Sequence, residues 1–169
     1  MIIAVIFQKG DQLQGKGHWG LTLFILSLIV FPLEINRYVI ALIFLTAFLS
    51  SLPDIDLKLG LAHRTFTHTL LFAILAGILF SILFGFIIKD VTWYIIGFLA
   101  GFGGVVLHLI GDLMTHMSFK PLYPFSSKEV AFGWFRSDNM IANFGFFLIG
   151  WIVFFMYLLH NSAILRSLL

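Results

Sequence analysis

The feature that most constrains the fold is a series of long apolar segments. Residues 66–88 contain no Asp, Glu, Lys or Arg, and a helix needs about 20 apolar residues to cross the hydrocarbon core of a bilayer. Charged residues make up only 11% of the chain, against roughly 25% in a soluble domain. The sequence therefore predicts an integral membrane protein, an all-α helical bundle that forms one domain over residues 1–169.

Five helical segments are expected, because polar stretches or prolines separate the apolar runs. The first two segments are near or below the length of a full span. Thr65 or Thr67 is the expected N-cap of the third segment. The predicted segments are residues 19–33, 38–52, 66–88, 92–117 and 140–159.

Glycines in the fourth segment suggest a helix contact. Gly97, Gly101 and Gly104 lie close to four residues apart, and small residues at this spacing allow helices to approach closely in a membrane. The general abundance of glycine in membrane helices is the alternative explanation. We expect Gly101 and Gly104 to face another helix rather than lipid.

The loops between the segments alternate in length and polarity. With five spans, the N-terminus and the two longer loops, 53–65 and 118–139, share one side. That side carries seven Lys and Arg residues, against three on the other. The positive-inside rule therefore places the two longer loops in the cytoplasm of a multi-pass inner-membrane protein.

Ionisable residues gather at this same end. Odd segments begin there and even segments end there, so the topology alone brings these residues together. Charged groups at the edge of a membrane are costly and tend to be functional. Five of the six histidines belong to the set, and only His160 falls at the other end. The set is His18, Asp54, Asp56, His63, Arg64, His68, His108, Asp112 and His116.

The spacing within this set points to a metal site. His108, Asp112 and His116 are four residues apart and would share one face of a helix. Asp54 and Asp56 would point the same way if their segment is extended. Asp and His are ligand types of hydrolytic metal centres, so we expect a divalent ion. His18 and His116 could instead be interfacial side chains, and Asp54 could cap a turn.

Four pieces of sequence resemble a known family: PDID (53–56), HRTFTHT (63–69), HLIGDLMT (108–115) and LYPFS (122–126). Together they resemble the YdjM-like family of inner-membrane proteins, which are regarded as metal-dependent hydrolases and grouped with the zinc-dependent phospholipase C and single-strand nuclease superfamily. The resemblance covers nearly the whole chain and implies one to three zinc ions. It supports His18, Asp54, Asp56, His63, Arg64, Thr67, His68, His108, Asp112 and Thr115. It is weaker for His116, and Ser118 stands where the family often has Gly.

The expected function is metal-assisted hydrolysis of a phosphoester such as a phospholipid or a lipid-linked phosphate. A divalent ion lowers the pKa of bound water toward about 7. We expect one of Asp54 and Asp56 to bind metal and the other to bridge ions or act as general base. Arg64 would bind a phosphate oxygen through its planar fork, and Arg136 is a weaker second candidate.

The expected partner is membrane lipid. The aromatic residues Phe132, Trp134 and Phe135 suit a lipid headgroup, although they also fit an ordinary interfacial belt. The net charge is only +2, without a basic tract, so no nucleic-acid partner is expected. The chain has no cysteine, which excludes thiolate metal sites. The sequence leaves the oligomeric state open.

The alternative is a non-catalytic metal-binding membrane protein, either a transporter or a regulator. A transporter would place ligands near the bilayer midplane and would usually show internal repeats. The polar residues instead cluster at one end of the segments, and no repeat is found. A regulator would hold its ion in a closed site, whereas a catalytic site keeps an open coordination position.

Overall fold

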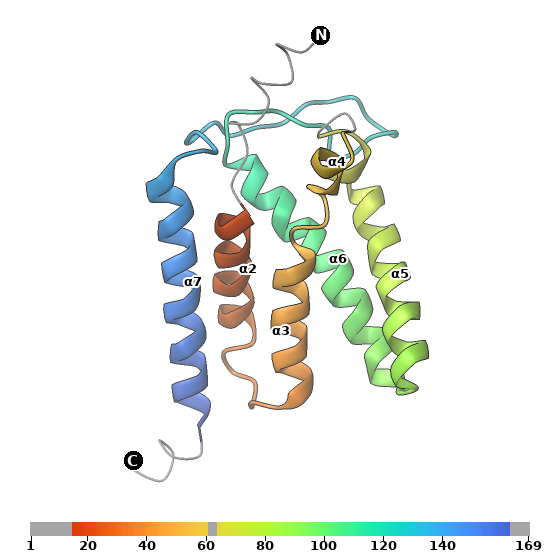
Figure 1. Ribbon diagram of the computed structural model, residues 1–169, viewed down its shortest axis with the longest axis vertical. Helices are drawn as coiled ribbons and strands as arrows, with labels where there is room; N and C mark the ends of the chain where they lie inside the picture. Colours follow the sequence, from red (N-terminus) through yellow and green to blue (C-terminus); the bar gives the residue numbers. More distant parts are fainter. Residues whose placement is uncertain (1–14, 61–63, 163–169) are drawn as a thin grey trace.

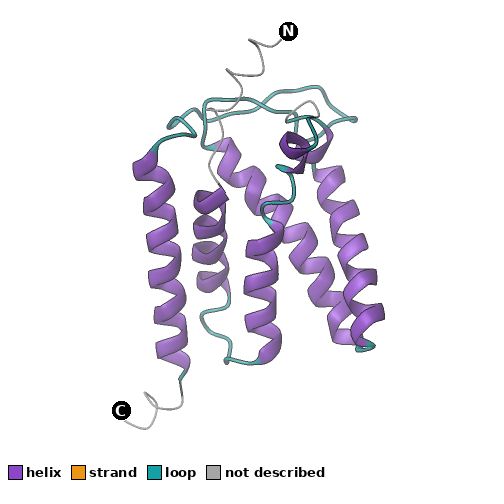
Figure 2. Cartoon of the chain, in the orientation of Figure 1, coloured by secondary structure: helices purple, strands orange, loops and turns teal. Residues whose placement is uncertain are grey.

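The structure is a computed structural model that describes residues 15–60 and 64–162. Within these residues the regular structure is helical, apart from two isolated bridges (Figure 2). The helices are α2 (Gly15–Ile29), α3 (Arg37–Leu49), α4 (Ile55–Lys58), the 3-10 helix η2 (Phe66–His68), α5 (Leu70–Ile88), α6 (Val91–Leu113) and α7 (Met140–Asn161). The predicted all-α bundle is confirmed.

The arrangement of the helices brings several helix ends together. Helix α5 packs against α6, α2 against α7, and both α2 and α3 against α6, which crosses the bundle obliquely (Figure 1). The start of α2, the end of α3, the start of α5 and the end of α6 all lie at the upper end in Figure 1. The segment 114–139 runs across this end before the chain enters α7. This end is where the ionisable residues were expected to meet.

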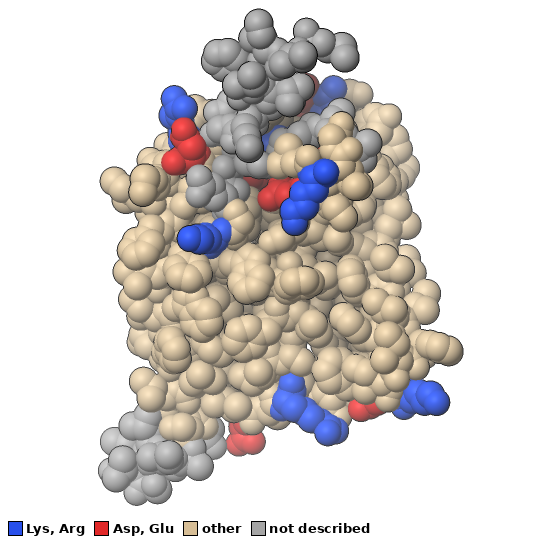
Figure 3. All heavy atoms as spheres, viewed as in Figure 1, with Lys and Arg blue, Asp and Glu red and all other residues tan. Residues whose placement is uncertain are grey.

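Within residues 15–60 and 64–162, three helices, α5, α6 and α7, are long and apolar enough to cross a membrane, and α3 is a shorter apolar helix. Large apolar side chains on α5 are exposed, as for Leu79 at 60% and Phe86 at 73%. On the face shown in Figure 3, charged side chains lie toward the two ends, and an uncharged belt separates them. An exposed apolar belt on helices that satisfy their own backbone hydrogen bonds is the surface that a bilayer requires.

The observed helix boundaries differ from the predicted ones because capping side chains set them. Helix α5 begins at Leu70, since the Thr69 hydroxyl accepts a hydrogen bond from the backbone N–H of Phe72 at 3.1 Å. The predicted caps Thr65 and Thr67 were therefore wrong. In the same way, Asp90 caps α6 by accepting from the Thr92 N–H at 2.9 Å.

The ends of three predicted segments also need correction. Helix α2 ends at Ile29, before the turn that contains Pro32. Helix α3 ends at Leu49, and the chain forms turns before it reaches Pro53. Helix α6 ends at Leu113 rather than at residue 117. Residues that were assigned to the ends of apolar helices thus lie in turns, after α3 and α6 at the end that carries the ionisable residues and after α2 at the opposite end.

Glycines allow the closest helix contacts, as predicted. Gly101 lies against the backbone of Ala76 on α5, where an added Cβ would be 2.6 Å from the carbonyl oxygen. Gly104 lies against the end of α3. Helices α2 and α7 also approach closely: a Cβ on Gly150 would overlap the backbone of Gly20, and a Cβ on Gly20 would overlap the backbone of Phe146 and Phe147. The expectation that Gly101 and Gly104 face other helices is confirmed.

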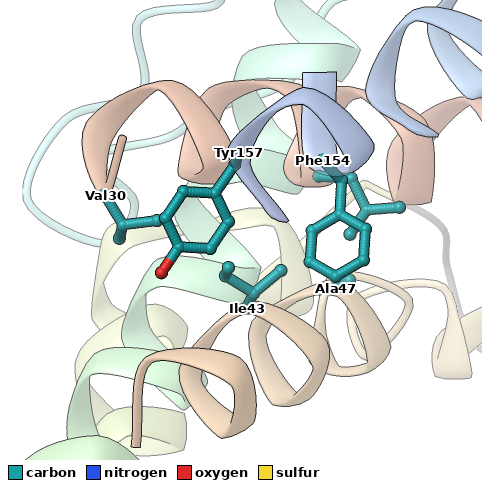
Figure 4. Close-up of a cluster of buried hydrophobic side chains, with 6 residues drawn as sticks. Val30, Ile43, Ala47, Phe154 and Tyr157 are labelled. Atoms are coloured by element: carbon teal, nitrogen blue, oxygen red, sulfur yellow. The ribbon is translucent and has the colours of Figure 1, made fainter. Parts of the chain in front are cut away.

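Two apolar clusters support the bundle. One lies between α2, α3 and α7 (Figure 4) and contains Leu23, Val30, Ile43, Ala47, Phe154 and Tyr157. The other joins α5 and α6 to the long loop and contains Ala73, Ala76, Val105, Leu109 and Phe119. Because Phe119 belongs to the segment after α6 and is only 2% exposed, this cluster fixes the loop against the end of the bundle.

Candidate metal centre

Five of the predicted ligands converge in the structure. His18 lies in the first turn of α2, Asp54 directly precedes α4, His68 ends η2, and His108 and Asp112 lie near the end of α6. Four of them are at most 1% exposed, whereas the side chain of Asp54 is 17% exposed. The helix ends therefore deliver a buried His and Asp cluster with one member near the surface.

Two imidazole nitrogens lie close to each other and to two carboxylate oxygens. The Nε2 atoms of His68 and His108 are 3.2 Å apart, and Oδ2 of Asp112 lies 3.3 Å from the first and 3.5 Å from the second. Oδ1 of Asp54 lies 3.5 Å from Nε2 of His108 and 3.9 Å from that of His68. Ligands at 2.0–2.2 Å from a tetrahedral zinc ion are separated by about 3.3–3.6 Å. The spacing of His68, His108 and Asp112 therefore fits three ligands of one ion, and Asp54 lies near enough to both histidines to be a further ligand.

Hydrogen bonds on the far side of each imidazole orient the two rings. Nδ1 of His108 donates to the carbonyl of Ser50 at 2.7 Å, which leaves its Nε2 as a lone pair. Nδ1 of His68 lies 3.0 Å from the hydroxyl of Thr67, which itself donates to Oδ2 of Asp56 at 2.7 Å. Nδ1 of His68 therefore carries a proton, and its Nε2 is also a lone pair. Two lone pairs that face each other at 3.2 Å repel unless a proton or a metal ion lies between them.

Unpaired polar atoms support the same conclusion. Among the described residues, the buried atoms without a hydrogen-bond partner include both ring nitrogens of His18, Oδ1 of Asp54 and Oδ2 of Asp112. Burial of such atoms is costly unless something satisfies them. Two groups have the ligand spacing of a metal site, one of His18, His108 and Asp112 and one of Asp54, His68 and His108, each with its ligand atoms within 4.8 Å of one another. The donor set therefore fits a divalent metal ion.

Asp112 divides its two oxygens between different partners. Oδ2 faces the histidines, whereas Oδ1 accepts a hydrogen bond from Nη2 of Arg64 at 2.9 Å and lies 3.6 Å from Nε2 of His18. Arg64 also donates to the hydroxyl of Thr115 at 3.1 Å and to the carbonyl of Met117. Its backbone is left-handed, with φ of 58°, a conformation that costs a non-glycine residue energy and is common at functional sites. Arg64 thus orients the Asp112 carboxylate.

The surroundings of His68 favour positive charge on its ring. Burial by itself lowers the pKa of His68, but hydrogen bonds to Asp112 and Asp56 outweigh this effect and raise it above the ordinary value of 6.5. The same carboxylates that attract a proton also attract a metal ion, because both are cations.

The comparisons with known proteins add the family. A family model described as YdjM inner membrane protein matches residues 13–167. The chain belongs to this family. Comparisons with curated proteins and with solved structures gave no match. The family match agrees with the apolar helices and supports a membrane protein of the inner membrane. The relation of the YdjM family to the phospholipase C superfamily stays a prediction.

Two predicted ligands of this YdjM-family chain lie elsewhere than expected. Asp56 lies on the Nδ1 side of His68, at 3.5 Å, because residues 55–58 form helix α4 and the expected extended segment is not formed. His116 is exposed and lies beyond the end of α6 at Leu113, so the four-residue spacing no longer stacks it on Asp112. His63 lies outside the described residues.

Three contributions to the site were not predicted from the sequence. The carbonyls of Ser50 and Met117 accept hydrogen bonds from His108 and Arg64, and a backbone acceptor leaves no signal in the side-chain sequence. The ring of Phe119 lies edge-on to that of His68, with centroids 6.4 Å apart. Its only sequence signal was an apolar residue in a polar loop.

Proposed function

We propose that this YdjM-family protein is a membrane-bound, metal-dependent phosphoester hydrolase whose substrates are phospholipids or lipid-linked phosphates. The observation that carries the proposal is the convergence of four ligand atoms from Asp54, His68, His108 and Asp112 at the polar end of the bundle. The resemblance to the zinc-dependent phospholipase C superfamily supports it. The excess of Lys and Arg in the two longer loops supports a multi-pass insertion with this end in the cytoplasm.

The four convergent residues would hold a divalent ion, with zinc as the expected metal. When bound, such an ion supplies Lewis acidity and an activated water at neutral pH. His18 is stacked on His108 with ring centroids 3.8 Å apart, and its unpaired Nε2 lies 3.6 Å from Asp112. His18 would therefore contribute to a second ion that shares the Asp112 carboxylate, because the one lone pair of His108, at Nε2, would already bind the first ion.

The surrounding residues have separate roles. Asp56 fixes the ring of His68 through Thr67. Arg64 holds the carboxylate of Asp112 through Nη2. Its expected contact with a phosphate oxygen would therefore have to come from a different N–H of the guanidinium. Asp54 is the member of the cluster that is exposed, at 17% of its side chain. It is therefore the carboxylate that a substrate or a water molecule can reach. Because Oδ1 is the atom that would bind the ion, the general base would be the other oxygen of Asp54.

The test measures hydrolysis and metal content together. The full chain is purified in detergent, stripped with a chelator and reloaded with zinc, and the products from phospholipid mixed micelles are identified by mass spectrometry. We expect hydrolysis that requires the metal and is lost in Asp54→Asn, whereas Glu34→Gln at the opposite end keeps it. A protein that binds zinc but cleaves no phospholipid and no chromogenic phosphodiester would instead be the non-catalytic alternative.

A further inference from the structure

A cavity of about 460 Å³ lies next to the metal-ligand cluster. Arg64 and Phe119 line it, and these are the residues that contact Asp112 and His68 on the other side. Arg64 and Phe119 therefore stand between the cavity and the cluster. Residues of the loop 114–139, which crosses this end of the bundle (Figure 1), form much of the cavity lining. A molecule held in it would lie one side chain away from the ligands of the metal.

The backbone pairing of the loop places two opposite charges in this cavity. Phe119 and Val130 form an antiparallel bridge with N···O distances of 3.3 and 3.0 Å. Because side chains alternate along paired strands, Phe119 points into the core while Ser118, Lys120 and Glu129 share the opposite side. All three line the cavity. The register of the bridge thus holds a cation and an anion at defined positions.

The charged pair is available to a ligand. Nζ of Lys120 lies 3.5 Å from Oε1 of Glu129, and their side chains are 44% and 56% exposed. The hydroxyl of Ser118 donates to Oε2 of Glu129 at 2.7 Å. This hydrogen bond and the neighbouring Lys120 lower the pKa of Glu129, which keeps the carboxylate ionised. An exposed ion pair contributes little stability, so a ligand that brings both charges can replace it.

The remaining lining indicates the kind of ligand. Phe66 and Tyr123 add aromatic rings, whose faces attract an ammonium group. Next to Tyr123, the side chains of Leu122 and Phe125 are 51% and 85% exposed. These apolar side chains lie at the end of a membrane bundle, where they suit contact with lipid. The ligand is thus expected to come from the bilayer.

We propose that this cavity binds the zwitterionic headgroup of a phospholipid with a primary amine, such as phosphatidylethanolamine. The phosphate lies toward Lys120 and Arg64, and the ammonium donates to Glu129. The inference rests on the proposed function, because it names the substrate class of that site. An anionic headgroup leaves Glu129 without a counter-charge, and a quaternary ammonium has no N–H to donate to the carboxylate.

The experiment measures lipid binding without hydrolysis. Delipidated, metal-free full-length protein is mixed with equal amounts of phosphatidylethanolamine, phosphatidylglycerol and phosphatidylcholine in detergent micelles, and bound lipid is counted by native mass spectrometry. We expect a preference for phosphatidylethanolamine of about fivefold, the size expected of exposed charge pairs. Glu129→Gln should abolish this preference. Lys120→Gln should weaken the binding of both phosphatidylethanolamine and phosphatidylglycerol.

The matched control is Lys128→Gln, which removes a positive charge from the same loop outside the cavity and should keep the preference. Equal binding of the three lipids by the wild type, or an unchanged preference in Glu129→Gln, would overturn the inference. If soluble glycerophosphoethanolamine displaced the lipid at equal concentration, the inference that the ligand comes from the bilayer would be refuted. The binding assay contains no metal, so it does not depend on hydrolysis. If the lipid preference is retained but the zinc-loaded protein hydrolyses nothing, the proposed enzymatic function is wrong and the headgroup site still stands.

Discussion

Nη2 of Arg64 donates to Oδ1 of Asp112 at 2.9 Å, and both side chains are buried. This bond leaves Oδ2 of Asp112 toward His68 and His108. An ion pair in such surroundings loses much hydration, and removal of one partner leaves the other charge unpaired. Burial of this ion pair therefore costs free energy. That cost is explained if Arg64 serves to orient the Asp112 carboxylate toward an ion bound by the histidines.

Replacement of Asp112 by Asn tests its assignment as a metal ligand. Asn keeps the shape of the side chain but removes the charge. We therefore expect metal affinity to fall by more than about 10–100-fold, the loss typical when a residue that only orients a ligand is replaced, and metal content to fall with it. Metal per protein is measured by elemental analysis on the folded, monodisperse fraction. Glu34→Gln removes a carboxylate at the opposite end and should keep full occupancy. Normal metal occupancy in Asp112→Asn would refute the assignment of Asp112 as a ligand. Loss of metal in both variants would show that the loss does not depend on the position of the carboxylate, which would also refute the assignment.

Replacement of Arg64 by Lys tests whether Arg64 acts through Asp112. Lys keeps the charge but cannot contact Asp112, Thr115 and Met117 at once, as the guanidinium does. We expect zinc affinity to fall by about 10-fold or more, as for other residues that orient ligands, in a chelator competition without substrate. Arg136→Lys, at an exposed pair with Asp138, should change nothing. Unaltered zinc affinity in Arg64→Lys would leave it only the phosphate-binding role.

The convergence of the site could be predicted because it depends on topology. Apolar runs of the right length alternate in direction, so the ends that carry His68, His108 and Asp112 had to meet. The i, i+4 spacing of His108 and Asp112 also survives, with Nε2 and Oδ2 at 3.5 Å. These inferences need only the order and length of the helices.

The finer features could not be predicted because they depend on local backbone turns. Residues 55–58 are helical rather than extended. Asp54 therefore faces the Nε2 atoms of the histidines, while Asp56 lies on the Nδ1 side of His68. The end of α6 at Leu113 decides that His116 leaves the cluster. The hydrogen bond of His108 to the Ser50 carbonyl joins residues distant in the chain, and no side-chain pattern marks it.

Replacement of Gly150 by Ala tests the contact between α2 and α7. The new Cβ would overlap the backbone of Gly20, so the helices must separate, at a cost of about 1–3 kcal/mol. Thermal unfolding in detergent should therefore shift to lower temperature. Gly145→Ala on the same helix meets nothing within 4 Å and should be neutral or slightly stabilising, because Ala favours helix. Equal stability of the two variants would exclude the close contact.

The last prediction concerns pH. The pKa of His68 is raised above 6.5, because Asp112 and Asp56 outweigh the opposing effect of burial. A raised pKa stabilises the metal-free fold below the ordinary pKa, and this contribution is lost as pH rises through the raised value. A metal ion needs the deprotonated ring, so its binding strengthens over the same range.

The melting temperature of protein stripped of metal by a chelator should thus fall with rising pH above 6.5, while the stabilisation by added zinc should grow. His68→Gln should flatten both trends, and His160→Gln at the opposite end should keep them. Zinc stabilisation that is independent of pH across this range would show that His68 is not among the ligands.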